Sequence, residues 1–321
     1  MFSTITLFMI LVVSLVLTLV IMPFYIRYMH SKQFGQEILQ DGPKWHQAKS
    51  GTPTMGGVVF ILSGIVTLII HAIIMQQWSH AIFVGVLSLL GFGLIGFIDD
   101  ALKIFHHKNQ GLTSKQKFIT QIGVGVLVGI CLYVMDLQGS VPLFGWTITN
   151  GFLVGAFLIL WMVGFSNAYN LTDGLDGLAA GNGIISLFGY FIMALLQSNA
   201  DVAALCIALI GGLLGFLFFN KKPAKIFMGD AGSLAIGGTL AVISVLLNQP
   251  WSLLGIGIIY VIETASVIIQ VAVFQKTGHR VFRMTPIHHH FEMGGWSEWK
   301  VDIVFWSITA VFTALSVLLL R

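Results

Sequence analysis

The sequence has very little charge. Only 9% of its 321 residues are Asp, Glu, Lys or Arg, whereas 56% are hydrophobic. Soluble domains carry roughly 25% charged residues, so this chain has too few to cover a surface that faces water. The shortage excludes a soluble globular protein and indicates that lipid is the solvent for most of the chain.

Cysteine is almost absent. The chain has only Cys131 and Cys206, and both lie inside apolar runs. Two isolated cysteines in such surroundings exclude a disulfide framework and indicate no zinc site. We interpret both as packing residues.

The chain is rich in long hydrophobic runs. A helix needs about 20 mostly apolar residues to cross a bilayer. The first run has no basic residue before it and no cleavage pattern, so we interpret it as a retained helix rather than a signal peptide. The sequence predicts an all-α polytopic membrane protein with ten spans, near residues 3–24, 56–75, 81–98, 118–135, 151–168, 177–197, 202–219, 233–249, 252–275 and 301–320.

Basic residues are missing from every second connection between these spans. Fifteen of the 16 fall on one face, and only Arg321 falls on the other. Because Lys and Arg mark cytoplasmic loops, this face is expected to be cytoplasmic and both termini to lie outside. The basic residues of this face are Arg27, Lys32, Lys44, Lys49, Lys103, Lys108, Lys115, Lys117, Lys221, Lys222, Lys225, Lys276, Arg280, Arg283 and Lys300.

The connections are too short to fold on their own, so residues 1–321 are expected to form a single membrane domain. The longest outer connection, residues 136–150, alternates apolar and polar residues around Pro142 and Gly145. This pattern predicts a small hairpin. We expect no nucleic-acid partner.

Acidic residues gather at three helix junctions of the basic face. Asp99 and Asp100 end the third span, Asp173 and Asp176 lie in "NLTDGLDG" after the fifth, and Asp230 opens the eighth. Solvated loop charge is the alternative for any one of them. Because three junctions share this feature, we expect the folded bundle to bring some of them together.

The stretch "NKKPAKIFMGDAGS", residues 220–233, combines three lysines with small residues at a helix start. A helix N-terminus attracts anions, and Mg²⁺ is held by one or two carboxylates together with substrate phosphates. We therefore favour Asp230 as a magnesium ligand. The alternative is a simple N-cap.

The adjacent carboxylates Asp99 and Asp100 repel each other, which raises the pKa of one of them toward a useful value. Such a group suits a general base acting on a phosphate, or a second ligand for the metal; the alternative is that both end the helix in water. Lys103 and Lys115 are candidates for phosphate contacts. Either of them alone is also explained by topology.

The stretch "RMTPIHHHFEMGG", residues 283–295, holds three consecutive histidines. In an extended backbone His288 and His290 would share a side and His289 would point away. Without a nearby cysteine or an HExxH spacing, zinc is disfavoured, and hydrogen bonding to a phosphate or carboxylate is favoured.

Glu263 is the only acid deep inside a span. An ionisable residue there is a functional candidate. The alternative, which we favour, is a hydrogen bond to a neighbouring helix. Gly255 and Gly257 make the same span a candidate for a bend or break.

In these motifs the chain resembles the polyprenyl-phosphate N-acetylhexosamine-1-phosphate transferases. Its histidine stretch resembles their muramoyl-pentapeptide branch rather than their N-acetylglucosamine branch. The resemblance covers the whole chain, through "GTPTMGG" at 51–57, "DDALK" at 99–103, "NLTDGLDG" at 170–177, "NKKPAKIFMGDAGS" at 220–233 and "TPIHHHFE" at 285–292.

The resemblance implies a ten-helix homodimer in the bacterial cytoplasmic membrane, with a broken ninth helix and an Mg²⁺-dependent site on the cytoplasmic face. It implies transfer from UDP-N-acetylmuramoyl-pentapeptide to undecaprenyl phosphate, with release of UMP. By resemblance Asp230 is the principal magnesium ligand, with Asp173 beside it, and Asp99, Asp100, Lys103, Lys115 and His289 serve turnover. The implied substrate-binding residues are Lys49, Thr54, Asn170, Asp173, Leu175, Asp176, Asn220, Phe227, Gly229, His288 and His290.

Phosphoryl transfer asks mainly for positioning and charge neutralisation. We favour direct displacement, in which Asp99 takes the proton of the lipid phosphate; a covalent aspartyl intermediate stays open. UDP-N-acetylglucosamine is the alternative donor. A secondary transporter is the alternative outside the enzymes, although its coupling acids are expected near the midplane, where only Glu263 is predicted. A structural scaffold explains the clustered acids poorly.

Overall fold

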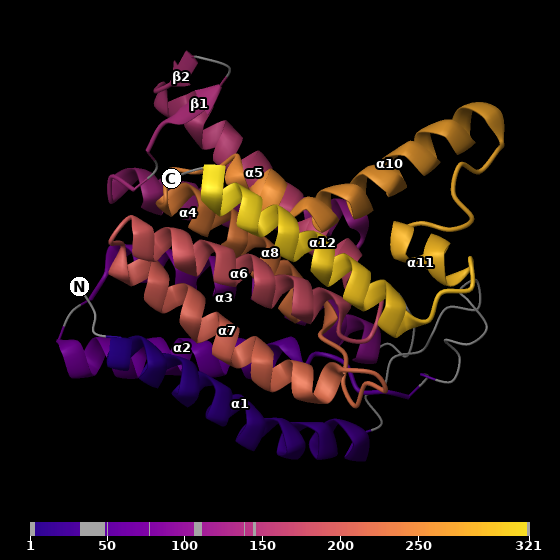
Figure 1. Cartoon of the computed structure of the whole chain (residues 1–321), viewed down its shortest axis with the longest axis horizontal. Helices are drawn as coiled ribbons and strands as arrows, with labels where there is room; N and C mark the ends of the chain where they lie inside the picture. The colour runs from indigo at the N-terminus through magenta and orange to yellow at the C-terminus, as the bar shows by residue number, and fades with distance from the viewer. Residues whose placement is uncertain are drawn as a thin grey trace.

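The computed structural model describes residues 4–32, 49, 51–76, 78–105, 111–137, 139–143 and 146–319. Lys44, Lys108 and Arg321, which the orientation argument uses, lie outside these residues. Within them the fold is a helical bundle with one small hairpin (Figure 1).

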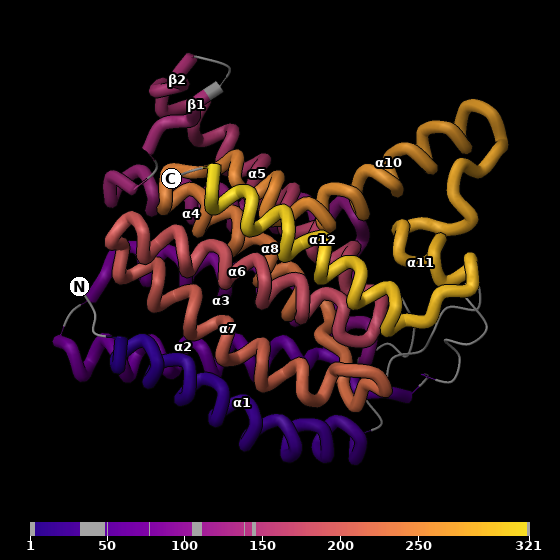
Figure 2. The backbone as a smooth tube through the Cα atoms, in the orientation of Figure 1, coloured from indigo at the N-terminus to yellow at the C-terminus, as the bar shows by residue number. Residues whose placement is uncertain are grey.

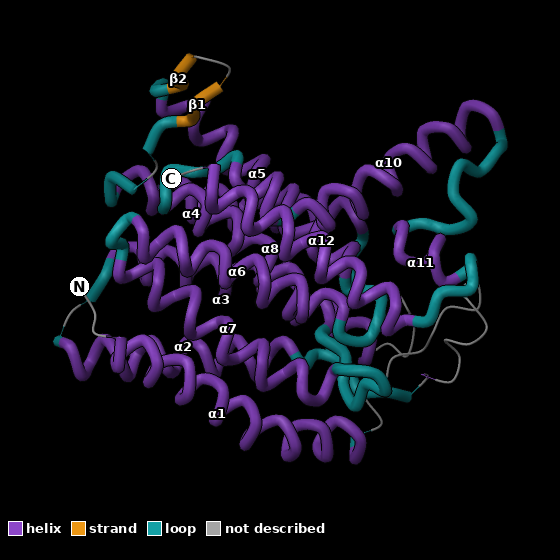
Figure 3. The backbone as a smooth tube through the Cα atoms, viewed as in Figure 1, coloured by secondary structure: helices purple, strands orange, loops and turns teal. Residues whose placement is uncertain are grey.

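Ten helices of the described chain are long and apolar enough to cross a membrane, which confirms the ten predicted spans. They pack side by side as one bundle, with the described loops at its two ends (Figure 3). The ten are α1 Thr4–Ser31, α2 Gly57–Met75, α3 His80–Phe105, α4 Ser114–Val134, α5 Gly151–Thr172, α6 Leu178–Leu196, α7 Ala200–Asn220, α8 Gly229–Leu246, α10 Ile258–Thr277 and α12 Glu298–Leu319.

The centre of the bundle is built on helices α7 and α8, whose residues are almost all buried. Small residues let neighbouring helices approach them closely. Gly57 of α2 lies against Gly232 of α8, and a Cβ added to Gly96 of α3 would lie 2.1 Å from the carbonyl oxygen of Asp230. The second contact presses the end of α3 against the start of α8, where the acidic junctions meet.

The predicted outer hairpin is present. Strand β1, Val141–Leu143, pairs antiparallel with β2, Trp146–Ile148, and Val141 lies opposite Ile148. The indole N–H of Trp251 donates a hydrogen bond to the carbonyl oxygen of Pro142. The hairpin is thereby fixed to the turn after α8, at the end of the bundle where α1 begins and α12 ends (Figure 1).

The ninth span is broken, as its glycines predicted. A short helix α9, Ser252–Ile256, ends at Gly257, and α10 begins at the next residue. A side chain at Gly257 would meet the carbonyl oxygen of Leu253 and the ring of Tyr260. Beyond the break α10 diverges from the bundle, and the chain returns beside it through a short helix α11, Ile287–Glu292 (Figure 2).

The helices that carry the acidic junctions extend beyond the predicted spans. Helix α3 continues to Phe105, α5 to Thr172, and α8 begins at Gly229. Asp99, Asp100 and Asp230 therefore lie on helices rather than beside them. The apolar runs stop earlier because these last turns carry polar residues that bond to one another inside the bundle.

Candidate active site

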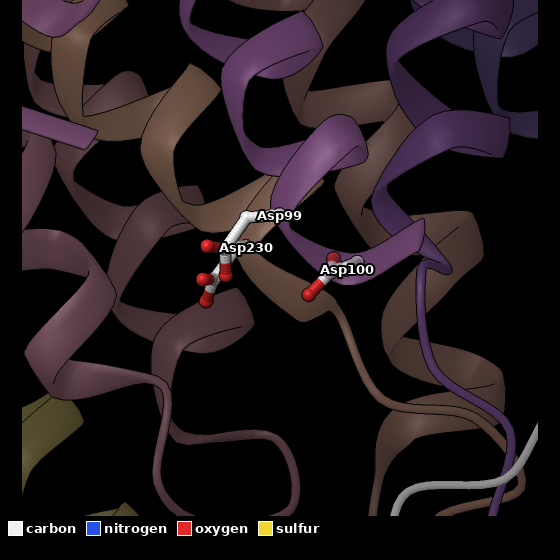
Figure 4. A group of neighbouring side chains, drawn as sticks. All are labelled: Asp99, Asp100 and Asp230. Atoms are coloured by element: carbon white, nitrogen blue, oxygen red, sulfur yellow. The ribbon is translucent and has the colours of Figure 1, made fainter. Parts of the chain in front are cut away.

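Three carboxylates from two helices meet at this end of the bundle. Each of Asp99 and Asp100 on α3 and Asp230 on α8 offers an oxygen, and these oxygens lie within 4.8 Å of one another. The side chains of Asp99 and Asp230 lie side by side, with Asp100 next to them (Figure 4). The prediction that separate acidic junctions converge is therefore confirmed for these two junctions.

Two lysines lie among the carboxylates. Lys103 Nζ is 2.6 Å from Asp99 Oδ2 and 3.1 Å from Asp230 Oδ2. Lys117 Nζ is 2.6 Å from Asp230 Oδ2. The cluster thus holds three carboxyl groups against two ammonium groups. In the present arrangement the two lysine ammonium groups supply the positive charge that faces these carboxylates.

Lys117 was not among the predicted site residues, whereas Lys115 was. Lys115 is exposed on α4 and is not brought to the cluster. The helical spacing of α4 distinguishes the two lysines. Lys117 lies on the same side of α4 as the residues that face the bundle, and Lys115 does not. The residues that face the bundle are Gln121, Gly125, Val128 and Leu132.

Asp100 and Asp99 are each fixed by a backbone N–H. Asp100 Oδ2 accepts a hydrogen bond from Ala231 N at 3.1 Å, and Asp99 Oδ1 accepts one from Leu112 N at 2.8 Å. Asp100 therefore binds an N–H of the first turn of α8, one of the donors that a helix leaves unpaired. Asp230 lies inside the first turn of α8, whose N-cap is Met228, so the N-cap alternative for Asp230 is wrong.

Asn170 holds Asp230 from the opposite side. Its Nδ2 donates to Asp230 Oδ1 and to Ser233 Oγ, both at 2.8 Å. Asn170 lies in the last turn of α5, one turn before Asp173. A residue predicted to bind substrate thus orients the predicted metal ligand.

Asp173 follows α5 and stands beside the three-carboxylate cluster rather than in it. Burial, together with the nearby charges of Asp230 and Asp176, raises the pKa of its carboxyl to about 8. A group in this environment holds a proton near neutral pH. Its role as a metal ligand stays a prediction.

A second charged cluster lies next to the first. Lys49 Nζ is 2.7 Å from both Asp176 Oδ1 and Glu298 Oε2, and Lys222 Nζ is 3.0 Å from Glu298 Oε1. Burial lowers the pKa of Lys49, but its hydrogen bonds with the two carboxylates outweigh burial and raise the pKa above its ordinary value. Glu298, in the first turn of α12, was not among the predicted residues.

Asn220 and Leu175 have structural contacts in addition to their predicted roles. Asn220 Oδ1 accepts from Gly177 N at 3.0 Å, and its Nδ2 donates to Ile226 O at 2.9 Å. The side chain of Leu175 is buried in a small core with Val301 and Phe305. Any substrate contact of Leu175 in this arrangement would therefore use its backbone.

Thr54, Phe227 and Gly229 come together through backbone contacts. Phe227 N donates to Pro53 O at 2.8 Å, and Gly56 N donates to Phe227 O at 2.9 Å. Gly229 has φ +73°, and a Cβ there would lie 2.5 Å from Asp100 Oδ2 and 2.9 Å from Thr54 Oγ1. Glycine is thus required at 229 by backbone conformation and by space.

The three histidines lie on helix α11, so the extended backbone considered for them is wrong. Each Nδ1 has its own partner. His288 Nδ1 is 3.0 Å from Glu263 Oε1, and His289 Nδ1 is 2.9 Å from Glu292 Oε2. His290 Nδ1 accepts from Arg283 N at 3.1 Å, so neutral His290 carries its proton on Nε2.

The three-carboxylate cluster fits a magnesium ion. Mg²⁺ prefers hard oxygen ligands and takes one or two carboxylates together with phosphate oxygens and water. Asp99, Asp100 and Asp230 supply oxygens at close spacing, and the presence of two ammonium groups among them shows that the site favours positive charge.

Known proteins are similar to this chain in sequence over nearly its whole length. Residues 81–248 match the family model described as glycosyl transferase family 4, and residues 49–61 match signature 1 of phospho-N-acetylmuramoyl-pentapeptide-transferase. Proteins with that name from Lactobacillus acidophilus and Enterococcus faecalis are 52% and 48% identical, over 95% and 96% of this chain and 95% and 97% of their own lengths. The protein of that name from Enterococcus hirae is 50% identical over 93% of each chain. The chain belongs to the phospho-N-acetylmuramoyl-pentapeptide-transferase family.

Proposed function

We propose that the protein transfers phospho-N-acetylmuramoyl-pentapeptide from UDP-N-acetylmuramoyl-pentapeptide to undecaprenyl phosphate, with Mg²⁺ as its cofactor. The products are UMP and undecaprenyl-pyrophosphoryl-N-acetylmuramoyl-pentapeptide, an intermediate of peptidoglycan synthesis. The observation that carries this proposal is the cluster of Asp99, Asp100 and Asp230 with two lysines at one end of a membrane bundle. The chain is 52% and 48% identical to two phospho-N-acetylmuramoyl-pentapeptide-transferases over nearly its full length, which supports the same reaction.

The position of the cluster suits a lipid acceptor. The phosphate of a polyprenyl phosphate lies at the headgroup level of the bilayer, so its chemistry belongs at the helix ends rather than at mid-membrane. The end that carries the cluster also carries the lysine-rich connections, and Lys and Arg mark the cytoplasmic side. We therefore place the site on the cytoplasmic face of the bacterial cell membrane, where a nucleotide sugar is present.

Asp230 would hold the magnesium ion, with Asp99 or Asp100 as a second ligand. When bound, the ion neutralises the diphosphate and stabilises the departing UMP. Lys103 and Lys117 are then released from their ion pairs with Asp230 and take phosphate oxygens as new partners.

The chemical step is a direct displacement. Asp99 accepts the proton of the lipid phosphate, and the phosphate oxygen attacks the phosphorus next to the sugar. A P–O bond forms to the lipid as the P–O bond to UMP breaks, and UMP leaves with the bonding electron pair. Trapping of a phospho-aspartyl enzyme in the absence of lipid would favour the covalent route instead.

The test is UMP release by detergent-solubilised protein given undecaprenyl phosphate and either UDP-N-acetylmuramoyl-pentapeptide or UDP-N-acetylglucosamine. UMP release is expected only with the first nucleotide and only with Mg²⁺. Release with UDP-N-acetylglucosamine instead would assign the protein to the other branch. We also expect a homodimer, which cross-linking in native membranes tests.

A further inference from the structure

Glu263 is a buried carboxylate that the proposed chemistry does not use. It lies on α10, six residues after the break at Gly257, and its side chain is fully buried. The residues of α10 that face the protein are few, and Glu263 shares that side of the helix with Tyr260, Ser266 and Gln270. Much of the rest of α10 is exposed and apolar, for example Ile268 and Val271. A carboxylate on such a helix is costly unless it has a partner.

The partner is the first histidine of the triplet. Glu263 Oε1 lies 3.0 Å from His288 Nδ1, and both side chains are fully buried. The contact joins α10 to α11, and Gln270 of α10 also bonds the loop between them at Val281 and Phe282. In the described part of the chain, the remaining atoms Glu263 Oε2 and His288 Nε2 have no hydrogen-bond partner. The pair is therefore held through one oxygen and one nitrogen.

His288 in turn contacts the loop that carries the aspartates. A Cβ built on Gly174 would lie 2.2 Å from His288 Nε2. The imidazole therefore fills the space that a side chain at position 174 would need. Gly174 lies between Asp173 and Asp176, so the histidine packs directly against the backbone that positions both.

A carboxylate next to Nδ1 determines the tautomer and the orientation of the imidazole. It keeps a proton on Nδ1 and fixes the ring orientation, so in the neutral ring the lone pair lies on Nε2. Here Nε2 points at the loop of Asp173 and Asp176. An apolar pair would fill the same space without burying the polar atoms Glu263 Oε2 and His288 Nε2, so packing alone does not account for Glu263.

We propose that Glu263 is a positioning residue, which fixes the Nδ1–H tautomer and orientation of His288 and thereby holds α11 against the aspartate loop at Gly174. This inference rests on the proposed transferase function, because the loop supplies Asp173 and Asp176 to that site. Glu263 acts through His288 and touches no reacting atom. The contact lies just beyond the break at Gly257, on the part of α10 that is still buried.

The first test compares Glu263→Gln with Glu263→Met. The amide oxygen of Gln still accepts the Nδ1–H, whereas Met has a similar shape and no comparable acceptor. We expect kcat/KM of Glu263→Met to fall by about tenfold or more, as for the loss of other groups that orient a histidine. Glu263→Gln is expected to stay within roughly threefold of wild type. Ser266→Ala, on the same buried side of α10, is the control for a general disturbance of the helix.

A spectroscopic signature separates positioning from simple folding. In protein labelled with ¹⁵N-histidine, the His288 resonances are identified by their loss in His288→Asn. Wild type and Glu263→Gln should show a protonated Nδ1 and an unprotonated Nε2, and Glu263→Met a mixture of tautomers. Wild-type kcat/KM or an unchanged tautomer in Glu263→Met would overturn the proposal, and so would a loss in Glu263→Gln as large as that in Glu263→Met.

Gly174→Ala changes the same contact from the side of the loop. It tests the proposal even if Glu263→Met does not fold. Gly174 is exposed, and the added methyl group has to displace His288. We expect a loss of kcat/KM similar to that of Glu263→Met, whereas Gly164→Ala, where a Cβ meets nothing within 4 Å, keeps wild-type activity. Wild-type kcat/KM in Gly174→Ala would refute the proposal.

Failure of the two proposals can be told apart. If wild-type protein releases no UMP from UDP-N-acetylmuramoyl-pentapeptide, the proposed function fails, and the His288 tautomer still reports whether Glu263 controls the imidazole. If wild-type protein is active and the variants match it, only the role of Glu263 fails.

Discussion

Lys117 Nζ lies 2.6 Å from Asp230 Oδ2, and this contact joins the start of α4 to the start of α8. Lys103 reaches the same oxygen from α3, at 3.1 Å. Two ammonium groups from different helices thus converge on one carboxylate oxygen. In the proposed function Asp230 would hold magnesium, and the two lysines would then pair with the phosphates of the nucleotide.

Lys117→Met should therefore reduce UMP release more than Lys115→Met does. Removing one charged group that stabilises a developing negative charge costs about 100-fold or more in rate, and we expect a loss of this size for Lys117→Met. Lys115 is exposed and outside the cluster, so Lys115→Met should lose only a few-fold, of the order of a surface charge. Initial rates of UMP release at saturating Mg²⁺ measure both. Equal losses would mean that distance from Asp230 does not decide which lysine acts.

Gly96→Ala should separate α3 from α8. A Cβ at residue 96 would lie 2.1 Å from the carbonyl oxygen of Asp230, so the two helices must move apart and carry Asp99 and Asp230 with them. We expect a destabilisation of about 1–3 kcal/mol, typical of overpacking, together with a large loss of activity. Gly123→Ala on α4, where a Cβ meets nothing within 4 Å, is the control. Thermal unfolding in detergent and UMP release are the measurements, and a Gly96→Ala protein with wild-type values for both would contradict the close packing.

The spans could be predicted from sequence because lipid imposes one simple requirement, about 20 apolar residues each. The ends of the spans at the site could not be predicted in this way, because a search for apolar residues ends each span at its first polar residues. Helix α3 continues past Asp99 and Asp100 to Phe105. Within these last turns Asp99 pairs with Lys103, and Asp100 accepts a hydrogen bond from the start of α8.

The clustering of acids at helix junctions was visible in the sequence, but their partners were not. Glu298 and Glu263 are each paired with residues far away in the chain, Lys49 and His288. The spacing of residues along one helix cannot predict pairs between residues so far apart in the chain. Lys117 could have been predicted, because the helical spacing of Gln121, Gly125, Val128 and Leu132 places it on the inner side of α4.

Magnesium should stabilise the wild-type protein and not Asp230→Asn. A ligand that binds only the folded state stabilises it by about 2.7 kcal/mol at a concentration 100 times its Kd. We therefore expect the thermal midpoint of chelator-treated wild-type protein to rise as Mg²⁺ is added, in the absence of any substrate. Asp230→Asn should show no rise and almost no UMP release, yet unfold cooperatively. A midpoint of Asp230→Asn that responds to Mg²⁺ as in wild type would remove Asp230 as the principal ligand.

The stability of the metal-free protein should depend on pH through Asp173. The pKa of this carboxyl is about 8 in the folded protein because of burial and of the nearby charges of Asp230 and Asp176, whereas in an unfolded chain it is about 3.9. Between these two values the folded state holds a proton that the unfolded state has lost, so the free energy of unfolding falls as pH rises. The contribution of Asp173 is complete below about pH 4 and is lost as pH rises to about 8. Asp173→Asn stays neutral throughout and should show a weaker decline. Thermal midpoints from pH 5 to 8, measured in a chelating buffer for both proteins, decide the point: parallel curves would mean that Asp173 does not titrate in this range.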